Sequence, residues 1–268
     1  MPLQVWVEQQ IILVRIEQRF LPRLTRAIER EYKAALAMVR ELGLEVASGK
    51  VLDSGIDTEL IDILASIYAE TGVRMARVAY RETLRKYPVR KPEQKAGGLM
   101  GIASSWLAAV RNALNRFALI FVTDISRTTR AQILVIFDKA AQEGWSYEKI
   151  AQVMLESGMA QRRARVIART EVHRGGMLGS LEGARSLPYE AQKVWVSGSD
   201  NRVRREPRDR FDHVELQGQT RDLEVPFRNE EDIMYPGDPN ASKGNSIQCR
   251  CVMNYIPKLD SKGNIIMK

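Results

Sequence analysis

The stretch that decides the fold is residues 193–251, which read KVWVSGSDNRVRREPRDRFDHVELQGQTRDLEVPFRNEEDIMYPGDPNASKGNSIQCRC. It is rich in Gly, Pro, Asp and Asn, the residue types that favour turns, and its apolar residues come in short runs. Both cysteines of the chain and one of its two histidines lie within it. A module of this composition cannot rely on a large apolar core alone, so it needs specific polar contacts, a metal ion or a partner.

The region before this stretch is predicted to be helical. Within residues 3–42, apolar side chains recur at three- and four-residue spacing, which predicts one long helix with an apolar stripe. Pro22 is expected to kink or split this helix, and residues 44–56 are expected to form a loop. Asp57 can then cap a helix that ends near Tyr87, because Pro88 disfavours its continuation.

Further helices are predicted at residues 101–122, 125–143, 146–157 and 160–185. Asp124 is expected to cap the second of these helices. The last helix contains four glycines, which are costly in a helix interior: Gly175, Gly176, Gly179 and Gly183. Either another backbone lies close to this helix, or the helix ends near the first of these glycines.

From about residue 192 the periodicity shortens. Strands are predicted at 194–196 and 251–256, with irregular strands near Val203 and at 213–216. The fold class is therefore predicted to be α+β and mainly α. The predicted organisation is a helical N-terminal region, 1–145, a small C-terminal α+β module with short strands, 146–258, and a polar, mobile tail, 259–268.

The charge balance favours an anionic partner. Lys plus Arg number 41 against 33 Asp plus Glu, which gives a net charge of +8. Such an excess favours nucleic acid over a membrane, although an ordinary solvated basic surface has the same composition. The arginines that could follow a phosphate backbone share a helix face or one loop: Arg74, Arg77, Arg81, Arg85, Arg162, Arg165, Arg205, Arg208 and Arg210. The alternative for the helical sets is a solvated helix face.

The cysteines and the hydropathy pattern indicate a protein made in a reducing cytoplasm. Cys249 and Cys251 are one residue apart, a spacing at which a disulfide would be strained. No apolar run reaches the roughly 18 residues that a membrane-spanning helix needs. The first residues lack the cationic start of a signal peptide.

A zinc site is one reading of the cysteine pair. His213, Cys249 and Cys251, with Asp200 or Asp238, supply ligand types that suit zinc, which would stabilise a module short of core. The C-x-C spacing differs from the usual C-x-x-C, and a buried thiol pair with a hydrogen-bonded histidine is the reading that we favour. His173 could join such a site, although a surface position is expected for it.

Catalysis is the second reading. Asp200, His213 and Asn245 could form a nuclease-like centre, but the chain lacks a paired-histidine signature and a phosphate-binding P-loop. Arg169 and Glu171 suit sugar-nucleotide transfer, yet two such residues on a helix are expected to form a salt bridge. We therefore expect no enzymatic activity. The alternative is a metal-dependent enzyme that acts on nucleic acid or a nucleotide.

The polar residues of the module are interpreted as architecture. Asp200 is expected to form an internal ion pair with Arg202 or Arg204 that fixes a turn. Asp238 is expected to do the same within residues 235–239, YPGDP, where proline and glycine set the turn.

A series of residues recurs in the order of a known family. The series is Trp195, Asp200, Arg202, Arg204, His213, Leu216, Gly218, Phe227, Tyr235, Pro236, Gly237, Asp238, Pro239, Asn245, Cys249 and Cys251, after an upstream Ala168, Arg169, Thr170 and Glu171. This arrangement resembles the phage Mu F-like minor head proteins, also called head morphogenesis proteins. The resemblance covers roughly residues 146–257, and the segment 205–212 is longer than the family's pattern.

The resemblance implies a structural role in a virion. It implies attachment at the portal vertex, action in head assembly and copies retained in the capsid, with host cytoplasm as the place of assembly. The implied partners are the portal protein, capsid or scaffold proteins and double-stranded DNA. We also expect Val5, Trp6, Ile11 and Ile12 to be buried only in the assembly, with Trp6 as an interface anchor.

Overall fold

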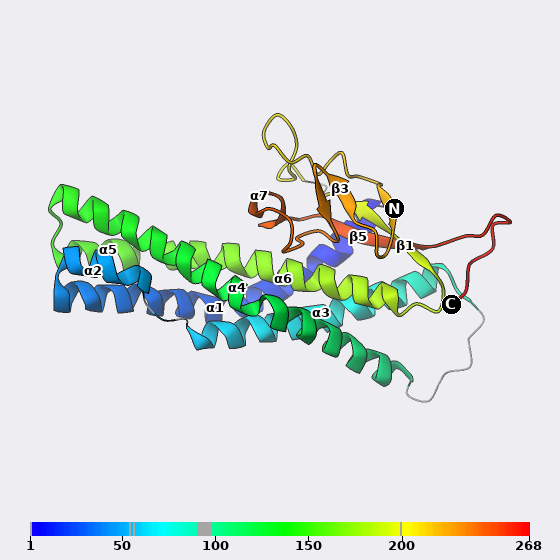
Figure 1. Ribbon diagram of the computed structural model, residues 1–268, viewed down its shortest axis with the longest axis horizontal. Helices are drawn as coiled ribbons and strands as arrows, with labels where there is room; N and C mark the ends of the chain where they lie inside the picture. The colour runs from blue at the N-terminus through cyan, green and yellow to red at the C-terminus, as the bar shows by residue number, and fades with distance from the viewer. Residues whose placement is uncertain (1, 54, 56, 90–97, 199) are drawn as a thin grey trace. The chain divides into compact units, whose positions relative to one another are not determined.

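The computed structural model describes residues 2–53, 55, 57–89, 98–198 and 200–268, and this part of the chain is mainly helical (Figure 1). The helices are α1 (Pro2–Leu42), α2 (Leu44–Lys50), the 3-10 turn η1 (Val51–Asp53), α3 (Thr58–Lys86), α4 (Gly98–Glu143), α5 (Tyr147–Glu156), α6 (Met159–Arg185) and α7 (Lys243–Ser246). The strands are β1 (Ala191–Val196), β2 (Thr220–Asp222), β3 (Phe227–Asn229), β4 (Glu231–Ile233) and β5 (Val252–Pro257). The predicted mainly α, α+β fold class is confirmed.

The elements form two compact units, each built from segments that are distant in the sequence. Unit 1 contains Met1–Ile16, Ser66–Leu114 and Arg169–Lys268, and unit 2 contains Glu17–Ala65 and Asn115–Ala168. The helices α1, α3, α4 and α6 each contribute residues to both units. This division differs from the linear division at residues 145 and 258 predicted above, because periodicity does not reveal which turns of a long helix pack together.

The prediction of a loop at residues 44–56 is wrong, because α2 and η1 occupy most of this segment of unit 2. Gly43 has a φ of 81°, which turns the chain so that α2 begins directly after α1. Ala47 and Val51 are 0% and 2% exposed. Burial of this small apolar face stabilises a helix too short to form alone.

Two long helices continue through positions where a break was predicted. α1 is not split at Pro22, which removes one backbone hydrogen bond while Phe20 and Leu24 on either side remain buried. α4 passes through Asp124, so the predicted cap there is wrong. The Asp124 carboxylate instead pairs with Arg127 at 2.5 Å, one helical turn away.

Other predicted helix ends are confirmed. Asp57 Oδ1 accepts a hydrogen bond from Glu59 N at 2.9 Å at the start of α3. Ser146 Oγ accepts one from Lys149 N at 3.3 Å and caps α5. The helix α6 runs unbroken through its glycines to Arg185.

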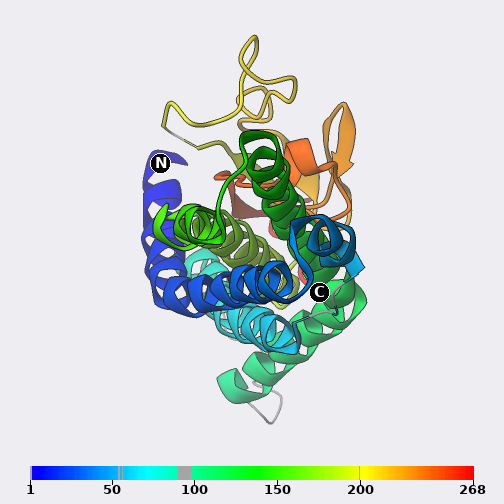
Figure 2. The ribbon, with the colours of Figure 1, turned by 90° about the vertical axis from the view of Figure 1, so that its left-hand side faces the viewer.

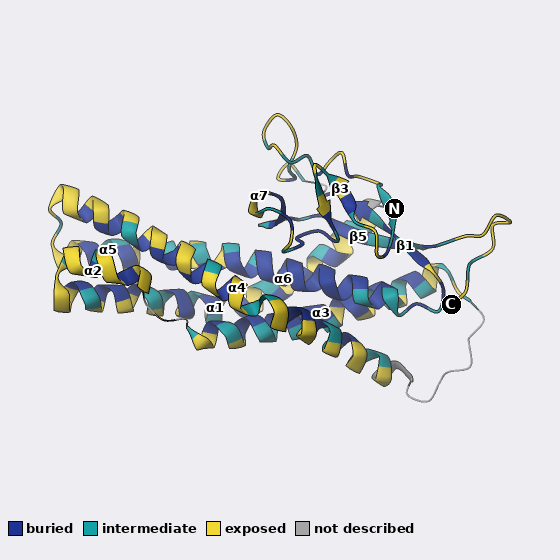
Figure 3. Cartoon of the chain, in the orientation of Figure 1, coloured by how far each residue is buried: buried dark blue, intermediate teal, exposed yellow. Residues whose placement is uncertain are grey.

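The glycines of α6 lie where another backbone passes close, and the alternative of a helix end near Gly175 is wrong. A Cβ atom built on Gly179 would lie 2.0 Å from Gly72 O, and one on Gly183 would lie 2.2 Å from Ala76 O. Both neighbours belong to α3, so α6 and α3 pack backbone to backbone within unit 1. The unit 1 part of α6 is almost entirely buried (Figure 3).

A three-stranded antiparallel sheet with the order β2-β1-β5 follows α6. Lys193 pairs with Tyr255 and Trp195 with Met253, and β3 and β4 form a separate hairpin. The irregular strands predicted near Val203 and at 213–216 are wrong, because these residues lie in turns. The segment 200–212, yellow in the figures, extends away from the strands (Figures 1 and 2).

Both ends of unit 1 are tied to its sheet. On α1, Trp6 Nε1 donates to Arg250 O at 2.8 Å and Gln9 Nε2 donates to Met253 O at 2.9 Å. Trp6 is therefore anchored within its own unit, contrary to the prediction that it is buried only in the assembly. The tail expected to be mobile also pairs with this unit, through a bridge between Tyr189 and Met267, and it folds back on itself through a bridge between Leu259 and Ile265.

Candidate functional site

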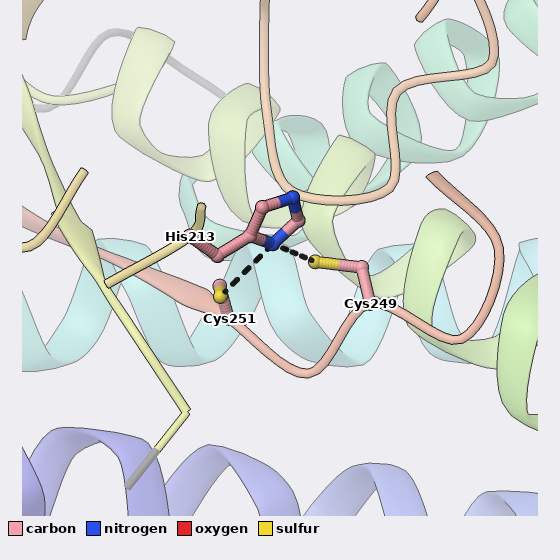
Figure 4. Close-up of side chains that lie close together, drawn as sticks. All are labelled: His213, Cys249 and Cys251. Atoms are coloured by element: carbon pink, nitrogen blue, oxygen red, sulfur yellow. Dashed lines mark hydrogen bonds between the residues drawn. The ribbon is translucent and has the colours of Figure 1, made fainter. Parts of the chain in front are cut away.

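His213, Cys249 and Cys251 form a compact cluster inside unit 1. Nδ1 of His213 lies 3.6 Å from Cys249 Sγ and 3.5 Å from Cys251 Sγ (Figure 4). The three side chains are 1%, 2% and 0% exposed in that order. The sequence predicted that these residues meet, and the geometry confirms it.

Local backbone geometry brings the two thiols to one side. Gln248 has a φ of 56°, so the chain turns sharply immediately before Cys249, and Cys249 N donates to Ser246 O at 3.3 Å. Cys251 directly precedes β5. On the facing segment, His213 N donates to Arg204 O at 3.0 Å, and the Ser197 hydroxyl donates to His213 O. These contacts fix the imidazole beside the sulfur atoms.

A polar chain sets the tautomer of His213. Its Nε2 lies 2.6 Å from Asn245 Oδ1, and Asn245 Nδ2 donates to Glu231 Oε2 at 3.3 Å. Because an amide oxygen can only accept, Nε2 of His213 carries the proton of this hydrogen bond. The neutral ring therefore presents the lone pair of Nδ1 to the two sulfur atoms.

Aromatic rings pack around the cluster. The ring of Trp195 lies edge-on to that of His213, with centroids 5.5 Å apart, and edge-on to Phe227 at 5.2 Å. The Nζ atom of Lys193 lies 5.0 Å from the Phe227 centroid and donates to Met234 O at 2.7 Å. Three residues of the predicted motif thus form one continuous core.

Burial and mutual contact displace the pKa values of the cluster. Burial raises the pKa of the Cys249 thiol, but hydrogen bonds with Cys251, His173 and His213 outweigh it and hold that pKa well below its usual range. Burial and the neighbouring Cys249 raise the pKa of Cys251 well above its usual value. Burial lowers the pKa of His213, but contact with Cys249 raises it overall. Of the two thiols, Cys249 is therefore the more readily deprotonated.

His173 is buried at 4% exposure, so the surface position predicted for it is wrong. The reason is that its face of α6 is covered by the turn 235–239: a Cβ atom at Gly237 would lie 3.2 Å from His173 Cδ2. Among the described residues, His173 Nε2 has no hydrogen-bond partner. An orphaned ring nitrogen in a protein core is uncommon and calls for an explanation.

Glu171 pairs with Arg174, so the predicted salt bridge with Arg169 is wrong. Arg174 Nη1 lies 2.8 Å from Glu171 Oε1, and the Tyr68 hydroxyl donates to Glu171 Oε2 at 2.9 Å. Residues three apart share a helix face, whereas residues two apart do not. Arg174 Nε also donates to Gly237 O at 3.1 Å, which joins α6 to the 235–239 turn. Helical spacing could have indicated Arg174.

Asp200 forms its ion pair with Arg250, at 2.6 Å, and not with Arg202 or Arg204 as predicted. With Arg202 it makes a backbone contact instead, because Asp200 Oδ1 accepts a hydrogen bond from Arg202 N at 3.1 Å. Arg204 instead pairs with Asp209 at 3.4 Å and donates to the backbone. The carboxylate is thus bound by a guanidinium fifty positions further along the chain, which local spacing could not indicate.

Asp238 fixes its turn as predicted, but it does so through hydrogen bonds to backbone N–H groups and not, among the described residues, through the expected ion pair. It is 1% exposed and its carboxylate accepts hydrogen bonds from Met234 N at 2.8 Å and Asn240 N at 2.9 Å. Pro236 is buried in the same turn. Gly218 has a φ of 80° and donates to Trp195 O at 2.9 Å, as a turn beside β1 requires.

Searches against protein-family models, curated proteins and solved structures found no match. Function is therefore inferred from the residues and geometry of the chain.

The arginines predicted to contact DNA are all exposed, but they fall into three groups. Arg74, Arg77, Arg81 and Arg85 line one face of α3 in unit 1. Arg162 and Arg165 belong to unit 2. Of the loop residues, Arg208 donates to backbone carbonyl groups and Arg210 pairs with Glu230 at 3.2 Å, whereas Arg205 borders a surface hollow. In the described part of the chain, no helix is long and apolar enough to cross a membrane.

Proposed function

We propose that this chain is a phage minor head protein that associates with the portal vertex and acts in head assembly. It would be made in the host cytoplasm and retained in the virion. The proposal rests on the resemblance over residues 146–257. The observation that carries it is the packing of the motif residues into one polar core: Trp195, His213, Phe227, Asp238, Asn245, Cys249 and Cys251 are each no more than 2% exposed. Such a core stabilises a compact module and leaves its surface for partners.

A metal-dependent enzyme acting on nucleic acid or a nucleotide is the second candidate, because the cluster offers metal ligands. A catalytic metal keeps one coordination position open for water or substrate. The cluster residues are almost fully buried, which favours a structural role over catalysis. Incubation of the full chain with DNA, RNA and nucleotides in the presence of Zn2+ or Mg2+ tests this candidate, and turnover that disappears in Cys249→Ser would favour it.

We assign the portal contact to the exposed apolar face of α1. Leu3, Val7, Ile11 and Val14 are 57%, 40%, 47% and 39% exposed and follow one another at helical spacing. Four large apolar side chains along one exposed helix face are unusual unless a partner covers them. The opposite side of the same segment is already used by Trp6 and Gln9 for contacts within unit 1.

Incorporation into phage heads tests this assignment. The variant with Leu3, Val7, Ile11 and Val14 replaced by Gln should keep the parent's melting temperature, but far fewer copies should enter heads assembled with the phage's own portal and capsid proteins. The matched control replaces Leu119, Ile120 and Val135, which are exposed apolar residues of α4 in unit 2. Loss of incorporation in the control alone would move the contact to α4. Normal incorporation of both would contradict portal association through either face.

A symmetry-relaxed cryo-electron reconstruction of purified heads gives an independent test. Density for this chain should be found at the portal vertex and not on the capsid lattice. Sequence-independent contact with double-stranded DNA through the α3 arginines is a further part of the proposal, since these side chains are exposed at helical spacing, although Arg85 also pairs with Glu82 at 2.5 Å.

A further inference from the structure

We propose that His173, His213, Cys249 and Cys251 bind one zinc ion, and that this ion ties helix α6 to the turn-rich module of unit 1. The ligand atoms of His213, Cys249 and Cys251 all lie within 4.8 Å of one another. Thiolate and imidazole groups are the ligands that zinc prefers, whereas calcium and magnesium take oxygen ligands. The inference does not depend on the role of the chain in phage heads.

The sulfur-to-nitrogen distances fit a tetrahedral ion. Zinc binds sulfur at about 2.3 Å and nitrogen at about 2.0–2.1 Å, so two such ligands at a tetrahedral angle lie about 3.5 Å apart. The observed distances from His213 Nδ1 are 3.6 Å to Cys249 Sγ and 3.5 Å to Cys251 Sγ. Both sulfur atoms also compete for the single lone pair of Nδ1. A cation between the three atoms satisfies all of them at once.

His173 supplies the fourth ligand. Its side chain is 4% exposed, and its Nε2 has no hydrogen-bond partner among the described residues. The His173 imidazole helps to lower the pKa of Cys249, which places it beside the cluster, whereas the ligand atoms that already lie within 4.8 Å of one another are those of His213, Cys249 and Cys251. A nitrogen lone pair directed at the zinc ion would account for this orphaned atom. The resulting Cys2His2 set is one of the common closed structural zinc sites.

The neighbours of His213 are those expected around a metal ligand. A metal-bound histidine usually donates its second ring N–H to an oxygen acceptor that fixes its tautomer and orientation. Asn245 Oδ1 accepts that hydrogen bond at 2.6 Å, and Glu231 holds the Asn245 amide in turn. Asn245 is therefore a positioning residue, since it acts on the ion only through His213.

The location of the ligands defines what the ion would do. His173 lies on α6, His213 follows the exposed loop, and the cysteines lead into β5. One ion would thus join three segments that are far apart in the sequence. All four ligands are almost completely buried, so the coordination sphere is closed, as in structural sites.

Metal content of the full-length chain provides the decisive measurement. Protein purified under reducing conditions without a chelator should contain about one zinc ion per chain. Replacement by Co2+ should give a thiolate-to-cobalt charge-transfer band and the intense visible bands of a tetrahedral complex. Wild-type protein with only trace zinc, or a cobalt spectrum without these bands, would overturn the proposal. Neither measurement requires a variant to fold.

Variants then test the individual ligands by competition with a chelator of known zinc affinity. Cys251→Ser should abolish stoichiometric zinc, and His173→Gln should weaken binding at least as much as the roughly 10- to 100-fold loss expected for Asn245→Ala. The control Asn254→Ala, on β5 in the same module, should bind zinc like the parent. An unchanged zinc affinity and cobalt spectrum in His173→Gln would refute the four-ligand set.

Discussion

Lys193 is a charged residue held inside the core of the C-terminal sheet. It is 0% exposed, and burial lowers its pKa from 10.5 to about 8, despite an opposing effect of Glu224. The unfolded chain therefore binds more protons than the folded chain between about pH 8 and pH 10.5. The free-energy cost of burying the protonated Lys193 is present in full below this pH window, and it falls as the pH rises through the window.

The free energy of unfolding should consequently rise with pH relative to a variant without this lysine. From pH 8 to pH 10 the wild-type chain should gain on the order of 2–3 kcal/mol over Lys193→Met, whose side chain does not titrate. Urea unfolding at several pH values measures the difference. The control variant Lys33→Met removes an exposed lysine, and its free energy of unfolding should rise with pH as that of the wild-type chain does. Parallel pH profiles for wild type and Lys193→Met would contradict a depressed pKa.

Asp200 should matter through its ion pair with Arg250. The two side chains are 29% and 19% exposed, so the loss of the carboxylate leaves a largely buried guanidinium without its partner. We expect Asp200→Ala to lower the free energy of unfolding by roughly 1–3 kcal/mol. The control is Asp232→Ala, which breaks an exposed pair with Arg228 and should cost less than about 1 kcal/mol. Equal melting temperatures for Asp200→Ala and the parent would show that the pair contributes nothing.

At the residue scale, the sequence indicated which residues belong to the polar core more reliably than it indicated which of them contact one another. Trp195, His213 and the two cysteines were predicted as a group, because few residue types suit a core that is both polar and buried. Their exact partners could not be predicted. The ion pair of Asp200 and the burial of His173 both depend on how α6 and the last strand are brought together.

At the scale of elements, the contact between α3 and α6 depends on glycine. Gly179→Ala would place a methyl carbon in severe overlap with Gly72 O, since the built Cβ is 2.0 Å from that oxygen. The two helices would have to separate, and we expect a loss of about 3 kcal/mol or more in the free energy of unfolding.

The same substitution elsewhere should have the opposite sign. Gly101 lies in α4, and a Cβ built on it meets nothing within 4 Å. Gly101→Ala should therefore stabilise the chain by up to about 1 kcal/mol through helix propensity. Thermal unfolding of the two variants beside the parent makes the comparison. A similar small shift for both would mean that α3 and α6 can adjust without cost.

Helices were predicted well from periodicity, and the errors have a common cause. α4 continues through Asp124 and α1 continues through Pro22. In both helices, burial of the apolar stripe on either side outweighs the local signal for a helix end. For Gly179, in contrast, the local sequence signal was correct. Its presence in a helix indicated a close backbone, but not that the partner is Gly72.

At the scale of the whole molecule, the basic face of α3 should bind DNA without regard to sequence. Phosphate contacts release counterions, and each one contributes about 0.9 to the slope of log affinity against log salt concentration. Replacement of Arg74, Arg77, Arg81 and Arg85 by Gln should therefore flatten this slope for double-stranded DNA. Fluorescence anisotropy over a range of salt concentrations measures it.

A control with the same change in net charge separates the α3 face from charge alone. Arg15, Arg26, Lys33 and Arg40 are exposed on α1, and their replacement by Gln should leave most of the slope intact. Equal flattening in both variants would indicate attraction by net charge. Undetectable binding of the parent even at low salt would leave the α3 arginines as a solvated face.

The interleaving of the two units has a consequence for synthesis on the ribosome. Every segment of unit 2 has been translated once Ala168 is made, whereas unit 1 still lacks everything from Arg169 onward. Until then, Trp6 and Gln9 have no Arg250 or Met253 to bind, and Gly72 and Ala76 of α3 lack the glycine face of α6 that packs against them. The first turns of α1 therefore cannot complete their contacts with unit 1 until residues 169–268 have been translated.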